Sequence, residues 1–148
     1  MKTKFLKLFL GTIVLLLTIS CKVAPEAIEY GKDQCAFCKM NIVDKTHAAQ
    51  FVTTKGKQFK FDAIECMINY IGQNSEENIA LLLVADFGNP GEMTDAETAT
   101  YLISTAIKSP MGAYLSAFSE KKTAKDVQQK NSGEIYTWET VKQKLSDK

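Results

Sequence analysis

The chain has 148 residues, of which 45% are hydrophobic, and its 18 basic and 17 acidic side chains give a formal net charge of +1. This length corresponds to about one domain and suffices to bury a core. A near-neutral charge argues against nucleic acid as a partner, because phosphate binding depends on a basic surface.

The N-terminus has the layout of a secretory signal peptide. Lys2, Lys4 and Lys7 precede an apolar stretch over residues 8–19. That stretch is too short for a membrane-spanning helix, which needs roughly 20 predominantly apolar residues. Its removal together with these lysines leaves a slightly acidic mature domain.

The leader ends in Leu-Thr-Ile-Ser-Cys, which resembles a bacterial lipobox, in which Cys21 becomes the lipidated first residue. Two acyl chains anchor a protein stably to a membrane where a single one does not. We therefore predict a lipoprotein signal peptide over 1–20, a lipidated N-terminus and tether over 21–33, and the functional domain over 34–148. The alternative is an unlipidated secreted protein with an odd thiol at its N-terminus.

Short strands and helices follow one another through the rest of the chain. In chain order we expect strands over 46–54 and 58–61, a helix over 62–72, a buried central strand over 79–87, a turn of helix over 94–98, strands over 100–107 and 113–118, a helix over 119–130, a strand over 135–137 and a helix over 138–145. Asp62 and Glu65 have the spacing of a capping box, and Ser119 is placed to cap the second long helix. Residues 109–112, Ser-Pro-Met-Gly, predict a tight turn.

A weak internal repeat divides this order into two related halves. Residues 56–62 and 133–139 share the pattern glycine, two residues, aromatic, one residue, aromatic, acid, and each leads into a helix. A methionine in a turn lies upstream of each copy, Met40 in the first and Met111 in the second. We therefore expect an α+β fold of two strand-rich ββα-type units, packed as one domain with the two methionine turns close together.

The run Cys-Ala-Phe-Cys-Lys-Met over 35–40 places two thiols and a thioether within six residues. With Cys21 set aside for lipid, Cys66 is the third cysteine, and an odd number of thiols cannot form a complete disulfide framework. Thiolate together with thioether selects Cu(I), whereas thiolates alone suit zinc, an iron–sulfur centre or a redox disulfide equally well. Met40 is therefore the discriminating residue, and it favours Cu(I).

Two other functions for Cys35 and Cys38 stay open. A thioredoxin-type redox pair follows a buried strand and opens a helix, but the residues before Cys35 are polar. A closed tetrahedral zinc site is the second alternative, with ligands from Cys35, Cys38, His47 and Cys66. Zinc leaves Met40 without a role. No acid/base pair, nucleophile elbow or phosphate loop in the sequence supports a further catalytic function.

The remaining candidates each have a structural explanation as well. His47 shares a predicted strand face with Phe51, so a hydrogen-bonded core histidine explains it at least as well as a metal ligand. Met67 lies on the apolar stripe of its helix, where core packing explains it, while Cys66 points off that stripe. Met111, between a proline and a glycine in a turn, has less reason to be buried and is the best candidate for a distant second thioether.

Several motifs occur together over residues 34–145. They are Cys35-x-x-Cys38-x-Met40, Phe61-Asp62 followed by Cys66-Met67, Ala99-x-Tyr101, Ser109-Pro110-Met111-Gly112 with Ala117-Phe118, and Gly133 with Trp138. Together with the lipobox, this combination resembles the NosL family of nitrous oxide reductase accessory lipoproteins, a group of copper-binding chaperones. The family commonly has glycine where this chain has Lys39.

The resemblance implies an α+β fold similar to a module of alkylmercury lyase. It further implies one Cu(I) bound on the periplasmic or cell-exterior side of a membrane. With an ABC-type membrane complex, that copper passes to nitrous oxide reductase or a similar cuproenzyme, so the protein is a chaperone and not an enzyme. For the metal site we expect Cys38 and Met40 at the centre and Cys35 and Met111 next, with His47, Cys66 and Met67 as further candidates.

Overall fold

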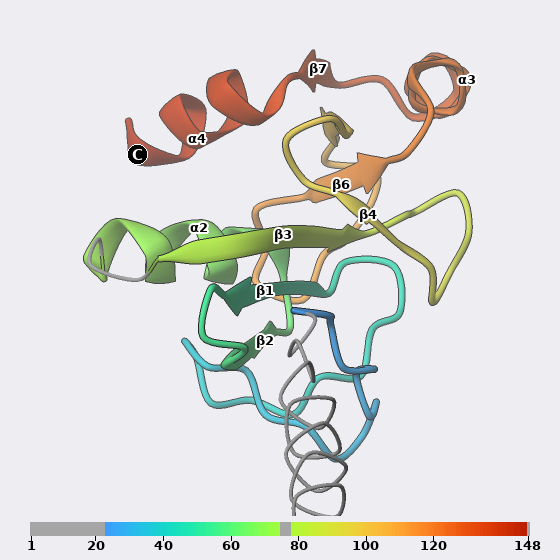
Figure 1. Cartoon of the computed structure of the whole chain (residues 1–148). Coiled ribbons are helices and arrows are strands. Elements are labelled where there is room, and N and C mark those ends of the chain that lie inside the picture. The colour runs from blue at the N-terminus through green and yellow to red at the C-terminus, as the bar shows by residue number, and fades with distance from the viewer. Residues whose placement is uncertain (1–22, 75–77, 148) are drawn as a thin grey trace, which may run out of the picture.

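The computed structural model describes residues 23–74 and 78–147, which form two antiparallel sheets with helices packed against them (Figure 1). This arrangement confirms the predicted α+β class. The predicted signal peptide over 1–20 and the predicted lipidation site Cys21 lie outside the described residues. Within those two described ranges, no helix combines the length and the apolar character needed to cross a bilayer.

The first sheet has the strand order β2-β1-β3-β4. Its strands are β1 (Ala49–Thr53), β2 (Gln58–Phe61), β3 (Ile79–Ala85) and β4 (Met93–Asp95). On β1, Phe51 lies opposite Phe59 of β2 and opposite Leu82 of β3. The rings of Phe51 and Phe59 stack with centroids 4.5 Å apart. Because β1 lies between two strands and all its residues are buried, it forms the centre of this half.

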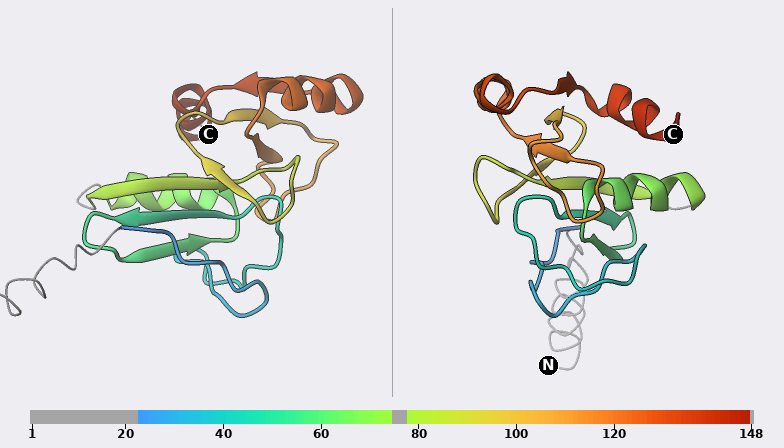
Figure 2. Two further views of the ribbon diagram at one scale, coloured as in Figure 1. Left: turned by 45° about the vertical axis from the view of Figure 1, so that its right-hand side comes forward. Right: turned by 180° about the vertical axis from the view of Figure 1, so that it is seen from behind.

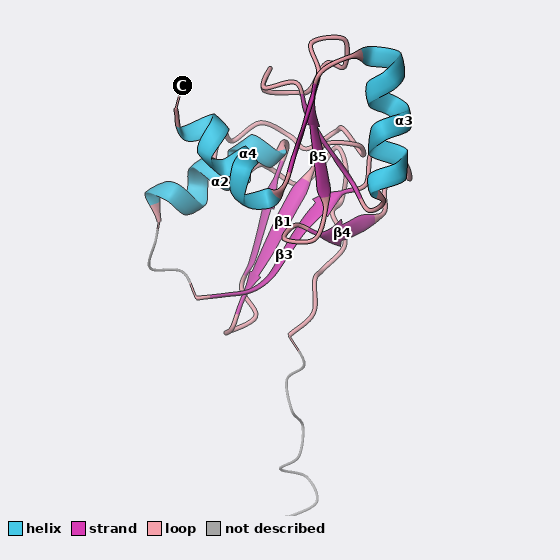
Figure 3. Ribbon diagram, turned by 90° about the horizontal axis from the view of Figure 1, so that it is seen from above, coloured by secondary structure: helices cyan, strands magenta, loops and turns pink. Residues whose placement is uncertain are grey.

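The second sheet has the order β6-β5-β7 and belongs to the C-terminal half. The strands of this sheet are β5 (Thr100–Ile103), β6 (Leu115–Phe118) and β7 (Glu134–Tyr136). The same half contains the helices α3 (Lys121–Asn131) and α4 (Trp138–Ser146). Figure 2 shows this half stacked over one side of the first sheet, with the N-terminal segment on the other side. The remaining helix, α2 (Ile64–Gln73), contacts β1, β2 and also β6, so it lies between the two halves. Figure 3 shows α3 on the opposite side of β5 from α2 and α4.

One hydrophobic core runs through both halves. Phe51 and Met67 from the first half and Tyr101 and Leu115 from the second are all fully buried members of it. Trp138 of α4 closes this core, with its ring 5.9 Å from that of Tyr101. A smaller cluster under α3 contains Leu102, Phe118 and Ala124. The shared core makes the two halves one domain.

Each half contains a strand that leads directly into a helix, β2 into α2 and β7 into α4, as the repeat predicts. Gly56 and Gly133, the first positions of the two copies, have φ values of +82° and +108°. Glycine reaches this region without steric cost. At Gly133 a side chain would also collide with the carbonyl oxygen of Ile103.

The predicted capping of both long helices is wrong. The N-cap of α2 is Ala63, which makes no side-chain cap, so Asp62 and Glu65 do not form a capping box. Ser119 does not cap α3, because its hydroxyl donates to Oδ2 of Asp86 at 2.6 Å. In each case the polar side chain makes contacts outside its own helix.

Two strand predictions need correction. The predicted helical turn over 94–98 is in part the strand β4, which pairs with β3 through Leu83 and Asp95. The Asp95 carboxylate then accepts hydrogen bonds from the N–H groups of Glu97 and Thr98, in the turn over 96–98 that follows the strand. The strand β3 is interior to the sheet as predicted, but residues 79–83 are only partly buried or exposed. An apolar run therefore identified the strand but overstated its burial.

The N-terminal segment over 24–33, predicted as part of the tether, lies along the first sheet. The Gln58 amide donates to the carbonyl of Ala24 at 3.0 Å, and Lys60 pairs with Asp33 at 2.7 Å. The N–H of Ala36 then donates to the carbonyl of Lys60 at 2.8 Å. These contacts hold the sulfur-rich run against the edge of β2.

Candidate metal centre

Three cysteine side chains converge where the N-terminal segment meets α2. The sulfur atoms of Cys35, Cys38 and Cys66 all lie within 4.8 Å of one another. Cys35 and Cys38 belong to the turn after the N-terminal segment, and Cys66 belongs to the first turn of α2. Because three soft donors at this spacing can surround one ion, this three-cysteine centre is the candidate metal site.

A tight turn fixes Cys35 relative to Cys38. The N–H of Cys35 donates to the carbonyl of Met40 at 2.8 Å, and the N–H of Lys39 donates to the carbonyl of Cys35 at 3.1 Å. Lys39 has φ +66°, in the left-handed region that favours glycine. Its Nζ donates to the carbonyl of Ala36 at 2.7 Å. Lysine at this position therefore keeps the backbone conformation that a glycine would favour.

The three sulfur atoms differ in exposure and in proton affinity. Cys35 is 0% exposed and Cys66 1%, whereas Cys38 is half-buried. A hydrogen bond from the Cys66 thiol lowers the pKa of Cys35, and the same bond, together with burial, raises the pKa of Cys66. Burial also raises the pKa of Cys38. The centre thus combines a thiolate at Cys35 with two thiols, and a soft cation that binds all three displaces their protons.

The candidate thioether Met40 is exposed and lies close to the centre in sequence. It follows Cys38 by two positions and is 52% exposed. Met67 of α2, by contrast, is fully buried in the hydrophobic core, where it packs against other apolar side chains. Of these two methionines, only Met40 is free to contact an ion or a partner.

The second candidate thioether, Met111, occupies the predicted tight turn, which the structure confirms. The N–H of Gly112 closes the turn by donating to the carbonyl of Ser109 at 3.2 Å. Met111 is 41% exposed and borders a cavity of about 290 Å³ that Glu65 also lines. The turn therefore lies against the Glu65 side of α2, and the residues that line this cavity do not include the three cysteines.

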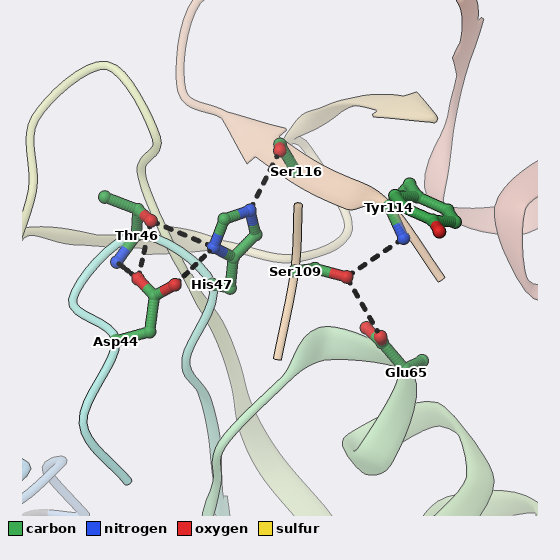
Figure 4. A network of polar contacts seen from close by, with 7 residues as sticks. All are labelled: Asp44, Thr46, His47, Glu65, Ser109, Tyr114 and Ser116. Atoms are coloured by element: carbon green, nitrogen blue, oxygen red, sulfur yellow. Dashed lines mark hydrogen bonds and ion pairs between the residues drawn. The ribbon is translucent and has the colours of Figure 1, made fainter. Parts of the chain in front are cut away.

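His47 lies in a separate hydrogen-bond network (Figure 4). Its Nδ1 is 2.9 Å from both Oδ2 of Asp44 and Oγ1 of Thr46, and its Nε2 is 3.1 Å from Oγ of Ser116. Ser116, His47 and Asp44 follow the contact order of a hydrolase triad, but Ser116 is fully buried and cannot meet a substrate. The network ties the loop before β1 to the second sheet.

The geometry bears on both alternative functions. A closed zinc site takes four ligands. The three-cysteine centre supplies three, and both ring nitrogens of His47 are already engaged. A thioredoxin-type pair opens a helix, whereas Cys35 and Cys38 lie in a turn before the first sheet.

Two buried carboxylates, Asp62 and Glu65, precede Cys66 in the chain, and the sequence pattern predicts only a helix-capping role for them. Asp62 is 1% exposed and Glu65 6%, and burial raises the pKa of both. Oδ1 of Asp62 and Oε2 of Glu65 have no hydrogen-bond partner among the residues that the structure describes. The sequence signal for their burial is the apolar context, since Ala63 and Ile64 lie between them and Cys66 and Met67 follow.

Comparisons with known proteins agree with one another. The model of the NosL family matches residues 27–146. The copper-binding lipoprotein NosL of Stutzerimonas stutzeri is 30% identical over 125 residues, which cover 78% of this chain and 65% of that protein. The chain thus matches just under two thirds of the length of this relative. The crystal structure of the copper chaperone NosL from Shewanella denitrificans has a TM-score of 0.68 at 19% identity, covering 79% of this chain and 94% of that one. Neither relative is named as an enzyme.

Proposed function

Because the chain belongs to the NosL family, we propose that it is a chaperone that binds one Cu(I) and passes it to another protein. The convergence of three sulfur atoms within 4.8 Å carries the proposal. Thiolate and thioether ligands select Cu(I) over harder ions. The named functions of the two relatives, copper binding and copper chaperoning, support the same assignment.

The ligand set follows from exposure. Cys35 and Cys66 form the buried side of the site, Cys38 the half-buried side, and Met40 the exposed rim. Met111 joins from the second half as a further thioether. His47 and Met67 are left out, since the first has hydrogen-bond partners at both ring nitrogens and the second packs in the core.

This arrangement suits transfer of the ion to a partner. Two of the sulfurs are shielded from water, which limits loss of the metal. An incoming ligand from a partner approaches at Cys38 and Met40, the open edge of the site. Such a ligand replaces one sulfur at a time, so the ion never needs to enter water.

Location and client complete the proposal. A lipid on Cys21 anchors the domain on the outer side of a membrane, as the lipobox indicates. The name of the Stutzerimonas relative, a copper-binding lipoprotein, supports this anchor. We infer that the receiving protein is nitrous oxide reductase or a similar cuproenzyme, and that an ABC-type membrane complex takes part in delivery. Both partners follow from the resemblance to the NosL family.

Anaerobic titration of the reduced mature protein with Cu(I), against a competing chelator, tests the proposal. Wild type is expected to retain one Cu(I), and Cys38→Ser or Met40→Leu to weaken it. Met67→Leu is the matched control, because it changes a methionine in the core and is expected to leave the affinity unchanged. If wild type does not retain Cu(I), the proposal is wrong.

Two parallel assays separate the alternatives. Titration with Zn(II) under the same conditions tests the alternative of a zinc-stabilised interaction protein. This alternative predicts that the site binds Zn(II) tightly, whereas the copper chaperone is expected to bind Zn(II) only weakly. An assay of disulfide reduction tests the thiol-disulfide oxidoreductase, for which turnover must depend on both Cys35 and Cys38.

A further inference from the structure

Glu65 connects the helix that carries Cys66 to the turn that carries Met111. Its Oε1 accepts a hydrogen bond from the N–H of Ala113 at 3.2 Å. The same oxygen accepts one from the hydroxyl of Ser109 at 3.4 Å (Figure 4). These two donors lie on either side of Met111 in the sequence. One carboxylate oxygen from α2 therefore holds both ends of the turn.

The backbone directly after this turn takes an unfavourable conformation, which the same contacts support. Tyr114 has φ +58°, in the left-handed region that favours glycine over every other residue. The N–H of Tyr114 donates to Oγ of Ser109 at 2.9 Å, and the same hydroxyl donates to Glu65. Two consecutive hydrogen bonds thus connect Glu65 through the Ser109 hydroxyl to the backbone of Tyr114.

Burial of a carboxylate at this position has a cost that packing alone does not explain. Glu65 is 6% exposed, and its Oε2 has no hydrogen-bond partner in the described part of the chain. A leucine of similar size fills such a position without an unpaired polar atom. The role of Glu65 therefore lies in what its other oxygen holds.

We propose that Glu65 is a positioning residue that places the Met111 turn where its thioether reaches the Cu(I) bound by Cys66 and its partners. This inference rests on the proposed function. Glu65 is adjacent to Cys66 in sequence, lines the same cavity as Met111 and bonds both ends of the Met111 turn, so its contacts fix the turn relative to α2. Glu65 itself does not touch the ion; it acts through Met111.

A double-mutant cycle in the full mature protein tests the inference, with Cu(I) affinity measured by competition against a chelator. Glu65→Leu and Met111→Leu are each expected to weaken Cu(I) binding by at least about tenfold, as loss of an outer-shell partner or a ligand does. The double variant is expected to bind no more weakly than Met111→Leu alone. Glu65→Gln keeps an acceptor oxygen and is expected to restore most of the affinity.

X-ray absorption at the copper edge supplies a readout that a merely structural role does not move. Glu65→Leu is expected to lose one sulfur from the copper coordination sphere, as Met111→Leu does. Ser109→Ala removes one donor to Glu65 without changing α2, and it is expected to weaken binding in the same direction. This second variant keeps the test valid if Glu65→Leu does not fold.

Independent effects of the two substitutions, or an unchanged affinity in Met111→Leu, would overturn the inference. An unchanged sulfur count in both Glu65→Leu and Ser109→Ala would do the same. Failure of the proposed function is a different result, because wild type itself then retains no Cu(I). If wild type retains Cu(I) but the two substitutions act independently, only the role of Glu65 is rejected and the proposed function stands.

Discussion

The sulfur atoms of Cys35 and Cys66 lie within 4.8 Å of each other, and they bring the turn after the N-terminal segment against the first turn of α2. Both residues are almost completely buried. Cys38 completes the group but remains half-buried, beside the exposed Met40. The three cysteines therefore have two roles, with a shielded inner pair and one accessible thiol.

Cys66→Ser tests the inner pair. Serine keeps the size and the hydrogen-bond donor but removes a sulfur ligand, so the Cu(I) affinity is expected to fall by at least about tenfold, which corresponds to about 1.4 kcal/mol. Chelator competition measures the change. Ile68→Val on the same helix is the control, since it alters core packing slightly and leaves the sulfurs in place. Wild-type affinity in Cys66→Ser would remove this residue from the ligand set.

Binding of Cu(I) is expected to release about two protons per ion near neutral pH. The raised pKa values keep Cys38 and Cys66 protonated, while the lowered pKa of Cys35 keeps it as thiolate. Affinity therefore rises with pH across the neutral range, because the displaced protons are released into a solution of lower proton concentration. Anaerobic calorimetry in buffers of different ionisation enthalpy measures the proton count. In Cys66→Ser the count is expected to fall by one.

Substitution of Lys39 tests the left-handed position in the cysteine turn. Lys39→Val places a β-branched residue at φ +66° and is expected to lower the free energy of unfolding by about 1–2 kcal/mol. Lys39→Gly is expected to be nearly neutral, since relief of backbone strain is offset by greater freedom in the unfolded chain. Urea unfolding of the metal-free protein measures both. Equal stability of the two variants would contradict the assigned conformation.

Two glycine substitutions are expected to have opposite effects on stability. Gly133→Ala introduces a methyl group that collides with the Ile103 carbonyl at φ +108°, and a loss of about 2 kcal/mol or more is expected. Gly72→Ala lies in the last turn of α2 with no atom near the added methyl, so a gain is expected that stays below the roughly 0.5–1 kcal/mol of a helix interior. Thermal unfolding compares the two. A neutral Gly133→Ala would show that the β5–β7 junction is less tightly packed than described.

Local patterns in the sequence determined much of the fold. The strand over 58–61, the turn over 109–112 and the helix over 138–145 follow from alternation, turn residues and helical spacing, which act between near neighbours in the chain. The repeat identified the strand-to-helix unit of each half. The sulfur run at 35–40 likewise indicated a metal site from spacing alone.

Tertiary structure alone decided how the parts of the site meet. Helical spacing showed that Cys66 leaves the apolar stripe of its helix, but α2 is buried between both halves, so that direction is filled by the cysteine turn. For the same reason Asp62 and Glu65 are buried and not helix caps. A one-dimensional pattern records which residues share a face. Which partner covers that face depends on how the sheets and helices pack, and here that packing brings Cys35, Cys38 and Cys66 together.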